Sequence, residues 1–158
     1  MEYHRTLLQV PFLNLMSNIV HRAGSVRVRV GGNTQETALM VSSLPSSPNG
    51  HNNGAILEKN ITGASNPTQT PPLVYTPDLI YMLGNISALV DVDWFLGVPF
   101  LREGGGDFEL DIVGVGESVL GQRLVGVQAG NEPDLYARHG HRPDVRHVFS
   151  PFFPGYEC

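Results

Sequence analysis

The chain has 158 residues, 41% of them hydrophobic, and a formal net charge of −5 from 15 Asp and Glu against 10 Lys and Arg. This composition predicts a globular domain with its own core and excludes a disordered chain. The acidic balance and the lack of a basic run argue against nucleic acid as a partner. No stretch of about 18 apolar residues occurs, so we expect no transmembrane helix and no membrane partner.

Cysteine use and glycosylation signals say little about the cellular compartment. Cys158 is the only cysteine, so no disulfide can form within the chain. Two N-x-[ST] sequons, at Asn60 and Asn85, support a secretory route only weakly, because sequons often arise by chance. The first residues show no signal-peptide pattern.

A helix followed by a strand is predicted near the start of the chain. Apolar residues at helical spacing predict a helix over about 11–23, and Gly24 is suited to end it. Alternation of Val and Arg with a period of two predicts a strand over 25–30. A short helix is expected over about 34–42.

Residues 43–76 differ in composition, with five prolines among Ser, Asn, Gly and Thr. This composition predicts a long surface insertion with a short hairpin near 55–57. A threonine, a proline and an acid at 76–78 then form a helix start signal, and this helix is expected to run to about residue 89.

Two further strands are predicted in the second half of the chain. Residues 92–98 read as a strand closed by a proline, and we expect Trp94 and Phe95 to lie in the core. A helix weakened by two glycines is predicted over 108–120, and a third strand over 124–129. Helix and strand therefore alternate three times.

This order predicts an α/β fold with a parallel sheet. Strands separated by helices form right-handed parallel units, and all three strands are short and apolar. Three strands cannot close a barrel, which needs eight strands and roughly 250 residues. We therefore expect a partial (β/α)8 TIM barrel, and a small open sheet with helices on both faces is the alternative.

The third strand leads directly into Asn131, Glu132 and Pro133. Proline cannot continue a strand ladder, so the strand ends there. In α/β barrels the catalytic side chains follow the carboxyl ends of the strands. Glu132 is thus a candidate general acid, and Asn131 is a candidate hydrogen-bond partner for a substrate hydroxyl. A plain turn is the alternative interpretation.

Other sequence signals point away from metal and nucleotide sites. His139, His141 and His147 belong to a loop with Gly and Pro, where a surface or substrate-rim position is expected and zinc is not. The glycines at 116 and 121 have phosphate-loop spacing, but the Lys-[ST] pair is missing and a strand follows them. We expect no metal and no cofactor.

Four segments in this order resemble glycoside hydrolase family 79, in particular its fungal β-glucuronidase branch, which is related to heparanase. The segments are residues 12–20, 26–35, 77–87 and 127–136. The resemblance implies a retaining hydrolase on an eight-fold β/α barrel with a β-sandwich domain after it. It also implies a carbohydrate substrate, a β-glucuronide, and an extracellular, secreted parent protein.

The resemblance assigns roles to the residues that follow the third predicted strand. Glu132 matches the acid/base glutamate after the fourth strand of the family's barrel. Asn131 matches the residue that contacts the sugar near its 2-hydroxyl. In this interpretation Tyr136 lines a sugar pocket, and packing in the core is the alternative that stays open.

The same resemblance makes the three strands the second to fourth of the barrel. Gly32 and Asn33 are then expected at the catalytic face, after the second strand. Related enzymes often hold an Arg on that strand beside the nucleophile. By alternation Arg27 and Arg29 share a face, and Arg29 matches because it lies nearer the catalytic end.

The chain departs from the family where the second catalytic carboxylate is concerned. The family's nucleophile is a Glu after the seventh strand, and the chain ends before that point. A retaining glycosidase needs two carboxyl groups about 5–5.5 Å apart. None of the other acids matches this nucleophile. Asp134 is expected to be a turn acid, and Glu36 and Glu103 are expected at the border of the site. Asp91 and Asp93 lie at the wrong end of their strand.

The matching region is therefore a partial catalytic barrel over 10–149, with a non-matching leader at 1–9 and a non-matching tail at 150–158. The expected function is that of a fragment of a retaining β-glucuronidase, which carries the acid/base Glu and is inactive alone. A non-catalytic carbohydrate-binding module and a nonfunctional truncated product are the alternatives.

Overall fold

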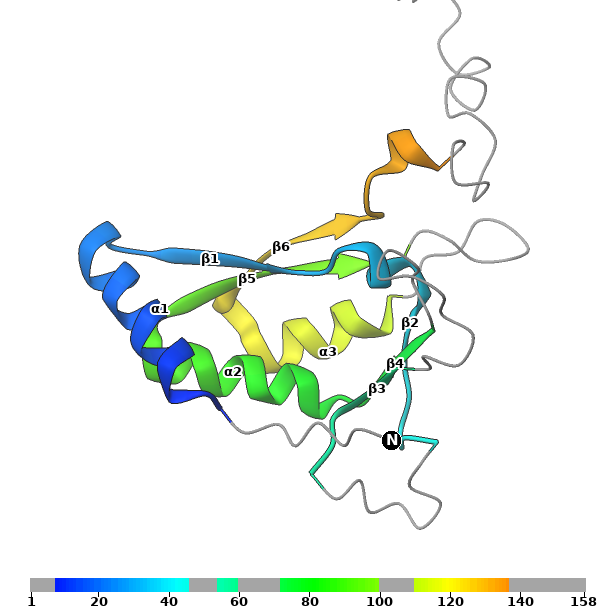
Figure 1. Cartoon of the computed structure of the whole chain (residues 1–158), viewed down its shortest axis with the longest axis horizontal. Coiled ribbons are helices and arrows are strands. Elements are labelled where there is room, and N and C mark those ends of the chain that lie inside the picture. Colours follow the sequence, from blue (N-terminus) through cyan, green and yellow to red (C-terminus); the bar gives the residue numbers. More distant parts are fainter. Residues whose placement is uncertain (1–7, 46–53, 60–71, 100–109, 137–158) are drawn as a thin grey trace, which may run out of the picture.

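The computed structural model describes residues 8–45, 54–59, 72–99 and 110–136. Within these ranges three helices and three longer strands alternate along the chain (Figure 1). They are α1 (Val10–Ala23), β1 (Val26–Val30), α2 (Asp78–Val90), β5 (Val92–Val98), α3 (Asp111–Leu120) and β6 (Leu124–Ala129). The predicted order of elements is confirmed, with boundaries that shift by a few residues.

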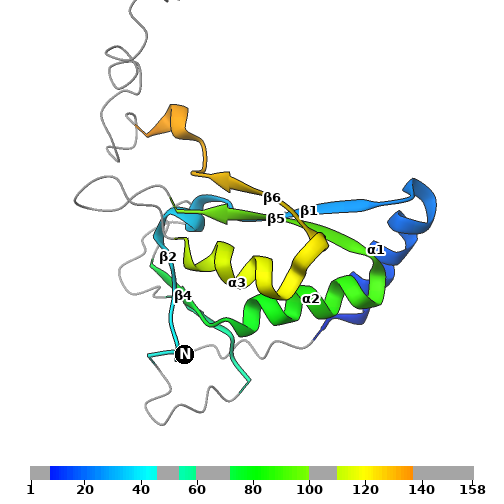
Figure 2. The same cartoon turned by 180° about the vertical axis from the view of Figure 1, so that it is seen from behind.

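The three longer strands form one parallel sheet in the order β1, β5, β6. Seen from both sides, α1, α2 and α3 all lie on the same side of this sheet (Figures 1 and 2). The other face of the sheet carries Arg27, Arg29, Phe95 and Gln128 and has no helix over it among the described residues. The predicted α/β class is thus confirmed, and the alternative with helices on both faces does not fit this part of the chain.

The core lies between the sheet and the helices, and Trp94 is at its centre. The indole is 2% exposed, and its Nε1 donates a hydrogen bond to Ser87 Oγ at 2.7 Å. Ser87 Oγ in turn donates to the Val92 carbonyl at 2.6 Å. Both buried polar groups are therefore satisfied, as buried Trp and Ser side chains require.

Phe95 does not join this core, although the sequence predicted it there beside Trp94. Adjacent residues of a strand point to opposite faces, so burial of Trp94 under the helices puts Phe95 on the uncovered face. The ring lies over Gly126 of β6, where an added Cβ would stand 2.8 Å from Phe95 Cε1. Packing on Gly126 leaves Phe95 only partly buried.

The expected helix over 34–42 is wrong beyond its first turn. The segment forms a 3-10 helix, η1 (Asn33–Thr37), and then the short strand β2 (Ala38–Met40). β2 pairs in parallel with β4 (Leu73–Tyr75), and β4 pairs antiparallel with β3 (Leu57–Lys59). Pairing with a strand more than thirty residues later overrides the local helical preference. Such long-range pairing cannot be seen in the periodicity of the sequence.

The ends of the predicted surface insertion at 43–76 belong to the packed structure. Leu44 is 2% exposed, Ile56 is 8% exposed and Tyr75 is 4% exposed. The predicted hairpin near 55–57 is replaced by pairing of β3 with the distant β4. Residues 46–53 and 60–71, which make up most of the insertion, lie outside the described residues.

The carboxyl ends of the sheet strands are joined by one buried side chain, Gln35 of η1. Gln35 is 3% exposed, and its Nε2 donates to the carbonyls of Val98 at 3.1 Å and Gln128 at 3.2 Å. The side chain occupies the space above Gly97, where an added Cβ would lie 2.1 Å from Gln35 Oε1 and 2.4 Å from Cδ. Gly97 is thus required for Gln35 to lie flat on the sheet.

Replacing Gly97 with alanine is therefore expected to destabilise the fold. Overpacking of a buried site costs about 1–3 kcal/mol, and here Gln35 must also move from its two carbonyl acceptors. Urea unfolding followed by circular dichroism measures the change. Gly114→Ala is the matched control, because an added Cβ there meets nothing within 4 Å and alanine favours a helix by up to about 1 kcal/mol. Equal midpoints for the two variants would contradict the tight contact.

Candidate functional site

Polar side chains gather where β1 and β6 end. Arg29 lies near the end of β1, and Asn33 begins the 3-10 helix that follows it. Gln128 lies near the end of β6, and Asn131 follows two residues after that strand. Because β1, β5 and β6 are parallel, their carboxyl ends meet at one edge, and these four side chains come together there.

A hydrogen-bond network connects them. Arg29 Nη1 donates to Gln128 Oε1 at 2.8 Å and to Asn131 Oδ1 at 3.3 Å. Asn131 Nδ2 donates to Asn33 Oδ1 at 3.0 Å. The amide of Asn131 is therefore held on both sides, with its oxygen toward Arg29 and its nitrogen toward Asn33.

Asn131 is also held from behind, through its backbone. Its N–H donates to Glu36 Oε1, and the Tyr136 hydroxyl donates to the same oxygen at 2.5 Å. Asn131 and Glu36 are each 9% exposed. A buried carboxylate is stable only when hydrogen bonds replace its water, and these two donors do so. Glu36 thus fixes the loop after β6 to the turn after β1.

Glu36 and Tyr136, which the sequence placed at the border of the site and in a sugar pocket, both lie behind Asn131 and support it. Glu36, which the sequence placed at the border of the site, lies behind Asn131 and is buried. Tyr136 is 2% exposed and directs its hydroxyl to Glu36. This burial favours the packing role for Tyr136 that the sequence left open, over contact with a sugar.

Glu132 lies at the surface in a backbone conformation that is unusual for a residue other than glycine. Its side chain is exposed, and Oε2 accepts from Asn131 Nδ2 at 3.4 Å. Its backbone has φ 51° and ψ 57°, the left-handed region, which costs a non-glycine residue on the order of 1 kcal/mol. Strain of this kind is concentrated at functional sites, where surrounding contacts enforce it.

The turns that deliver these side chains depend on two glycines. Gly130, between β6 and Asn131, has φ 69°, and Gly32, just before Asn33, has φ 113° and ψ −163°. The second pair of angles is open only to glycine. Gly32, predicted as a binding residue, therefore has a clear role in setting the direction of the chain into Asn33.

The amino ends of the strands carry a separate charged cluster. Arg123 forms ion pairs with Asp91 and with Asp93, the latter at 3.1 Å. The hydrogen bonds that Arg123 donates, first to Asp93 and then to Asp91, raise the pKa of the Arg123 guanidinium. The geometry bears out the expectation that both aspartates lie at the end of β5 opposite to the site.

Two residues that support the site, Gln35 and Gln128, were not assigned a role from sequence. Gln35 follows β1 closely, and Gln128 interrupts an otherwise apolar strand, which is a signal that a polar partner exists. Glu103, His139, His141 and His147 lie outside the described residues.

Within the described ranges no three His, Cys, Asp or Glu side chains are grouped to hold a metal ion. No described helix is long and apolar enough to cross a membrane.

Comparison with known proteins adds no assignment to this geometry. No protein-family model matches the chain, and no curated protein matches it.

Proposed function

We propose that the chain is part of a retaining glycoside hydrolase that resembles the β-glucuronidases of family 79. In this proposal β1, β5 and β6 are the second, third and fourth strands of an eight-fold β/α barrel. The placement of all three helices on one face supports it, because barrel strands have helices only on their outer side. The uncovered face, with Arg29 and Gln128, corresponds to the inside of the barrel.

The observation that carries the proposal is an exposed carboxylate beside a rigidly held amide at the carboxyl ends of parallel strands. Glu132 is accessible to a ligand, while Asn131 is fixed by Arg29, Asn33 and Glu36. Catalytic groups on barrels occupy this end, and they need supporting contacts that hold their geometry. No comparable cluster occurs at the opposite end of the described strands, where Arg123 neutralises the two aspartates.

The network leaves hydrogen-bonding capacity for a sugar hydroxyl. Asn131 Oδ1 has two lone pairs and accepts one hydrogen bond, from Arg29. The contact between Asn131 Nδ2 and Glu132, at 3.4 Å, is the longest of the set and is easily exchanged for a ligand oxygen. A hydroxyl next to the scissile bond can therefore contact Asn131 while Glu132 faces the glycosidic oxygen.

In the proposed reaction Glu132 acts twice. It donates a proton to the glycosidic oxygen as the bond to the anomeric carbon breaks, and the carboxylate nucleophile bonds to that carbon. It then removes a proton from the water that hydrolyses the glycosyl-enzyme intermediate. The nucleophile is assigned to a Glu after the seventh strand, and a secreted parent protein is part of the same proposal.

A second candidate function is sugar binding without cleavage. Among the described residues of the network, Glu132 is the one exposed carboxylate, whereas Glu36 is buried and holds the backbone of Asn131. A retaining mechanism needs two carboxyl groups that both face the substrate. A site with one of them would bind a carbohydrate and leave it intact. A nonfunctional truncated product is the third possibility.

The purified chain is expected to give no detectable hydrolysis of an aryl β-glucuronide, because covalent retention requires the nucleophile. The same chain is expected to bind methyl β-D-glucuronide, with shifts of the Asn131 and Asn33 signals in amide NMR spectra. Asn131→Ala should abolish the shifts. Asn85→Ala, at an exposed amide on α2, is the control that should leave them unchanged.

The outcomes separate the three functions. Turnover that is lost in Glu132→Gln would show that the chain holds a complete site, contrary to the expectation of inactivity. Binding without turnover supports either the glycosidase part or the binding module. A folded chain that shows no shift with the glucuronide would reject both and leave the nonfunctional product.

A further inference from the structure

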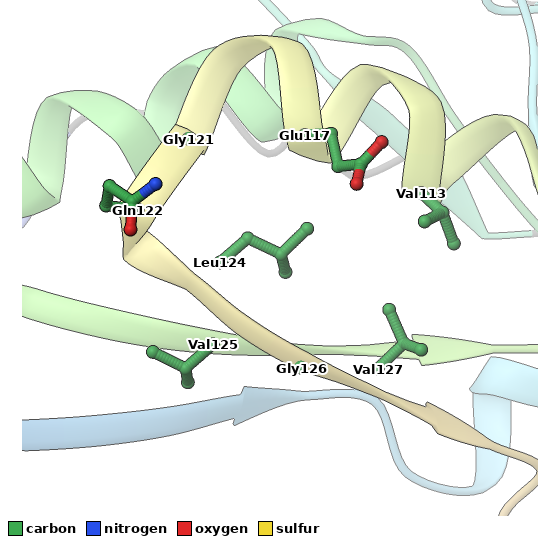
Figure 3. A pocket seen from close by; sticks show the side chains of 8 residues that line it. All are labelled: Val113, Glu117, Gly121, Gln122, Leu124, Val125, Gly126 and Val127. Carbon is green, nitrogen blue, oxygen red and sulfur yellow. The ribbon is translucent and has the colours of Figure 1, made fainter.

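One edge of the main sheet borders an open groove between α3 and β6, lined by both polar and apolar groups. The groove has a volume of about 400 Å³, and Val113, Glu117, Leu124 and Val127 contribute to its lining. In Figure 3, Leu124 and Val127 point from β6 toward α3. Leu96, the neighbour of Val127 on β5, is fully buried, whereas Val127 is 49% exposed. Val127 therefore has the position of a core residue without a helix over it in the described part of the chain.

The opposite edge of the sheet carries an exposed apolar stripe on α1. Leu15 is 54% exposed and Ile19 is 37% exposed, and Arg22 is also exposed. Their spacing of four and three residues puts them on one side of the helix. Phe12, Leu13 and Met16 on the adjacent side pack against the core. The stripe is thus an outward extension of the apolar face of α1.

Each strand of the sheet is preceded by a helix, and successive helices pack beside one another. α2 precedes β5 and contacts α1, and α3 precedes β6 and contacts α2. A further helix and strand after β6 would continue this arrangement over Val127. The unit formed by α1 and β1 has the same order, and within the described residues β1 has no strand on its outer edge.

We propose that the groove between α3 and β6 binds the α1 and β1 unit of a second copy of this chain. β1 of the second copy pairs in parallel with β6, and its α1 lies beside α3 with Leu15 and Ile19 over Val127. The outer backbone groups of β1 and β6, which pair with no other strand among the described residues, are satisfied in this arrangement. The proposal concerns this chain by itself and not the barrel of the proposed function, in which the next helix and strand would occupy the same groove.

The charges of the two surfaces agree with this pairing. Glu117 lines the groove, and Arg22 belongs to the stripe on α1. Both residues lie in the second half of their helices, and both helices run toward the amino ends of the strands. In the proposed pairing the two side chains therefore lie at a similar height along the strands. The contact joins different surfaces, so it leaves one groove and one stripe open and builds a head-to-tail assembly.

The test uses one charged substitution in each surface. Val127→Asp disables the groove, and Leu15→Asp disables the stripe. Each variant alone is expected to be monomeric by sedimentation velocity, with the concentration for half-association raised at least about tenfold. A mixture of the two is expected to form one-to-one dimers, because each supplies the surface that the other has lost. Tyr81→Asp, at an exposed site on α2 outside both surfaces, is the control that should associate like the wild type.

Charge reversal gives an independent readout of the same contact. Glu117→Arg and Arg22→Glu should each weaken association, and the double variant should restore it. Circular dichroism must show equal folding of all variants. A wild-type chain that stays monomeric at its highest soluble concentration would overturn the proposal. So would a mixture of Val127→Asp and Leu15→Asp that remains monomeric, since only a contact between unlike surfaces permits that rescue.

Discussion

Replacing Trp94 with alanine is expected to lower the free energy of unfolding by about 3–5 kcal/mol, the range for large aromatic residues in a core. The indole is 2% exposed under the helices and packs within the main hydrophobic cluster. Its removal leaves a cavity and also leaves the buried Ser87 hydroxyl without its donor. For a single domain of this size such a loss is a large part of the total stability. Urea unfolding monitored by circular dichroism measures it.

Two further variants separate the contributions to this loss. Trp94→Phe keeps an aromatic ring but removes the Nε1 donor to Ser87, so a smaller loss of about 1–3 kcal/mol is expected. Tyr81→Ala removes an aromatic side chain that is 56% exposed on α2, and surface changes of this kind stay within about 0.5 kcal/mol. If Trp94→Ala cost no more than Tyr81→Ala, the packing of the helices on β5 would be wrong.

In a chimera in which residues 10–149 replace the matching second to fourth units of a family 79 barrel, Glu132→Ala is expected to slow the hydrolysis of substrates with poor leaving groups by about 10²–10⁴-fold. Activated aryl β-glucuronides should lose much less, because their leaving groups depart without a proton. External azide should partly restore turnover of an activated substrate, since a small anion can attack the intermediate without a general base. Steady-state rates across a series of leaving groups measure the effect.

Asp134→Ala is the matched control for this experiment. Asp134 is an exposed acid two residues after Glu132, in the 3-10 helix η3 (Pro133–Leu135). Its loss is expected to leave the dependence on the leaving group unchanged. Equal losses for all leaving groups in Glu132→Ala, together with no effect of azide, would remove Glu132 from the acid/base role.

The longer elements and their order were determined by the sequence alone. The helical spacing of apolar residues in α1 and the period of two in β1 are local patterns, and each is strong enough to specify its own element. The end of β6 at Ala129 is also set locally, because Gly130 and Pro133 lie in the loop that contains Glu132. Because helices separate the strands, a parallel sheet with its carboxyl ends on one edge also follows from chain order.

The tertiary structure alone decided which face of each strand is buried and which residues support the site. β2 exists because β4 lies beside it, and Phe95 is outside the core because Trp94 is inside. Arg29 contacts Asn131 across 102 residues of sequence, and Glu36 does so across 95. Contacts between distant segments leave no periodicity in the sequence. The location of Asn131 and Glu132 was therefore predictable, whereas the residues that hold Asn131 in place became known only from the fold.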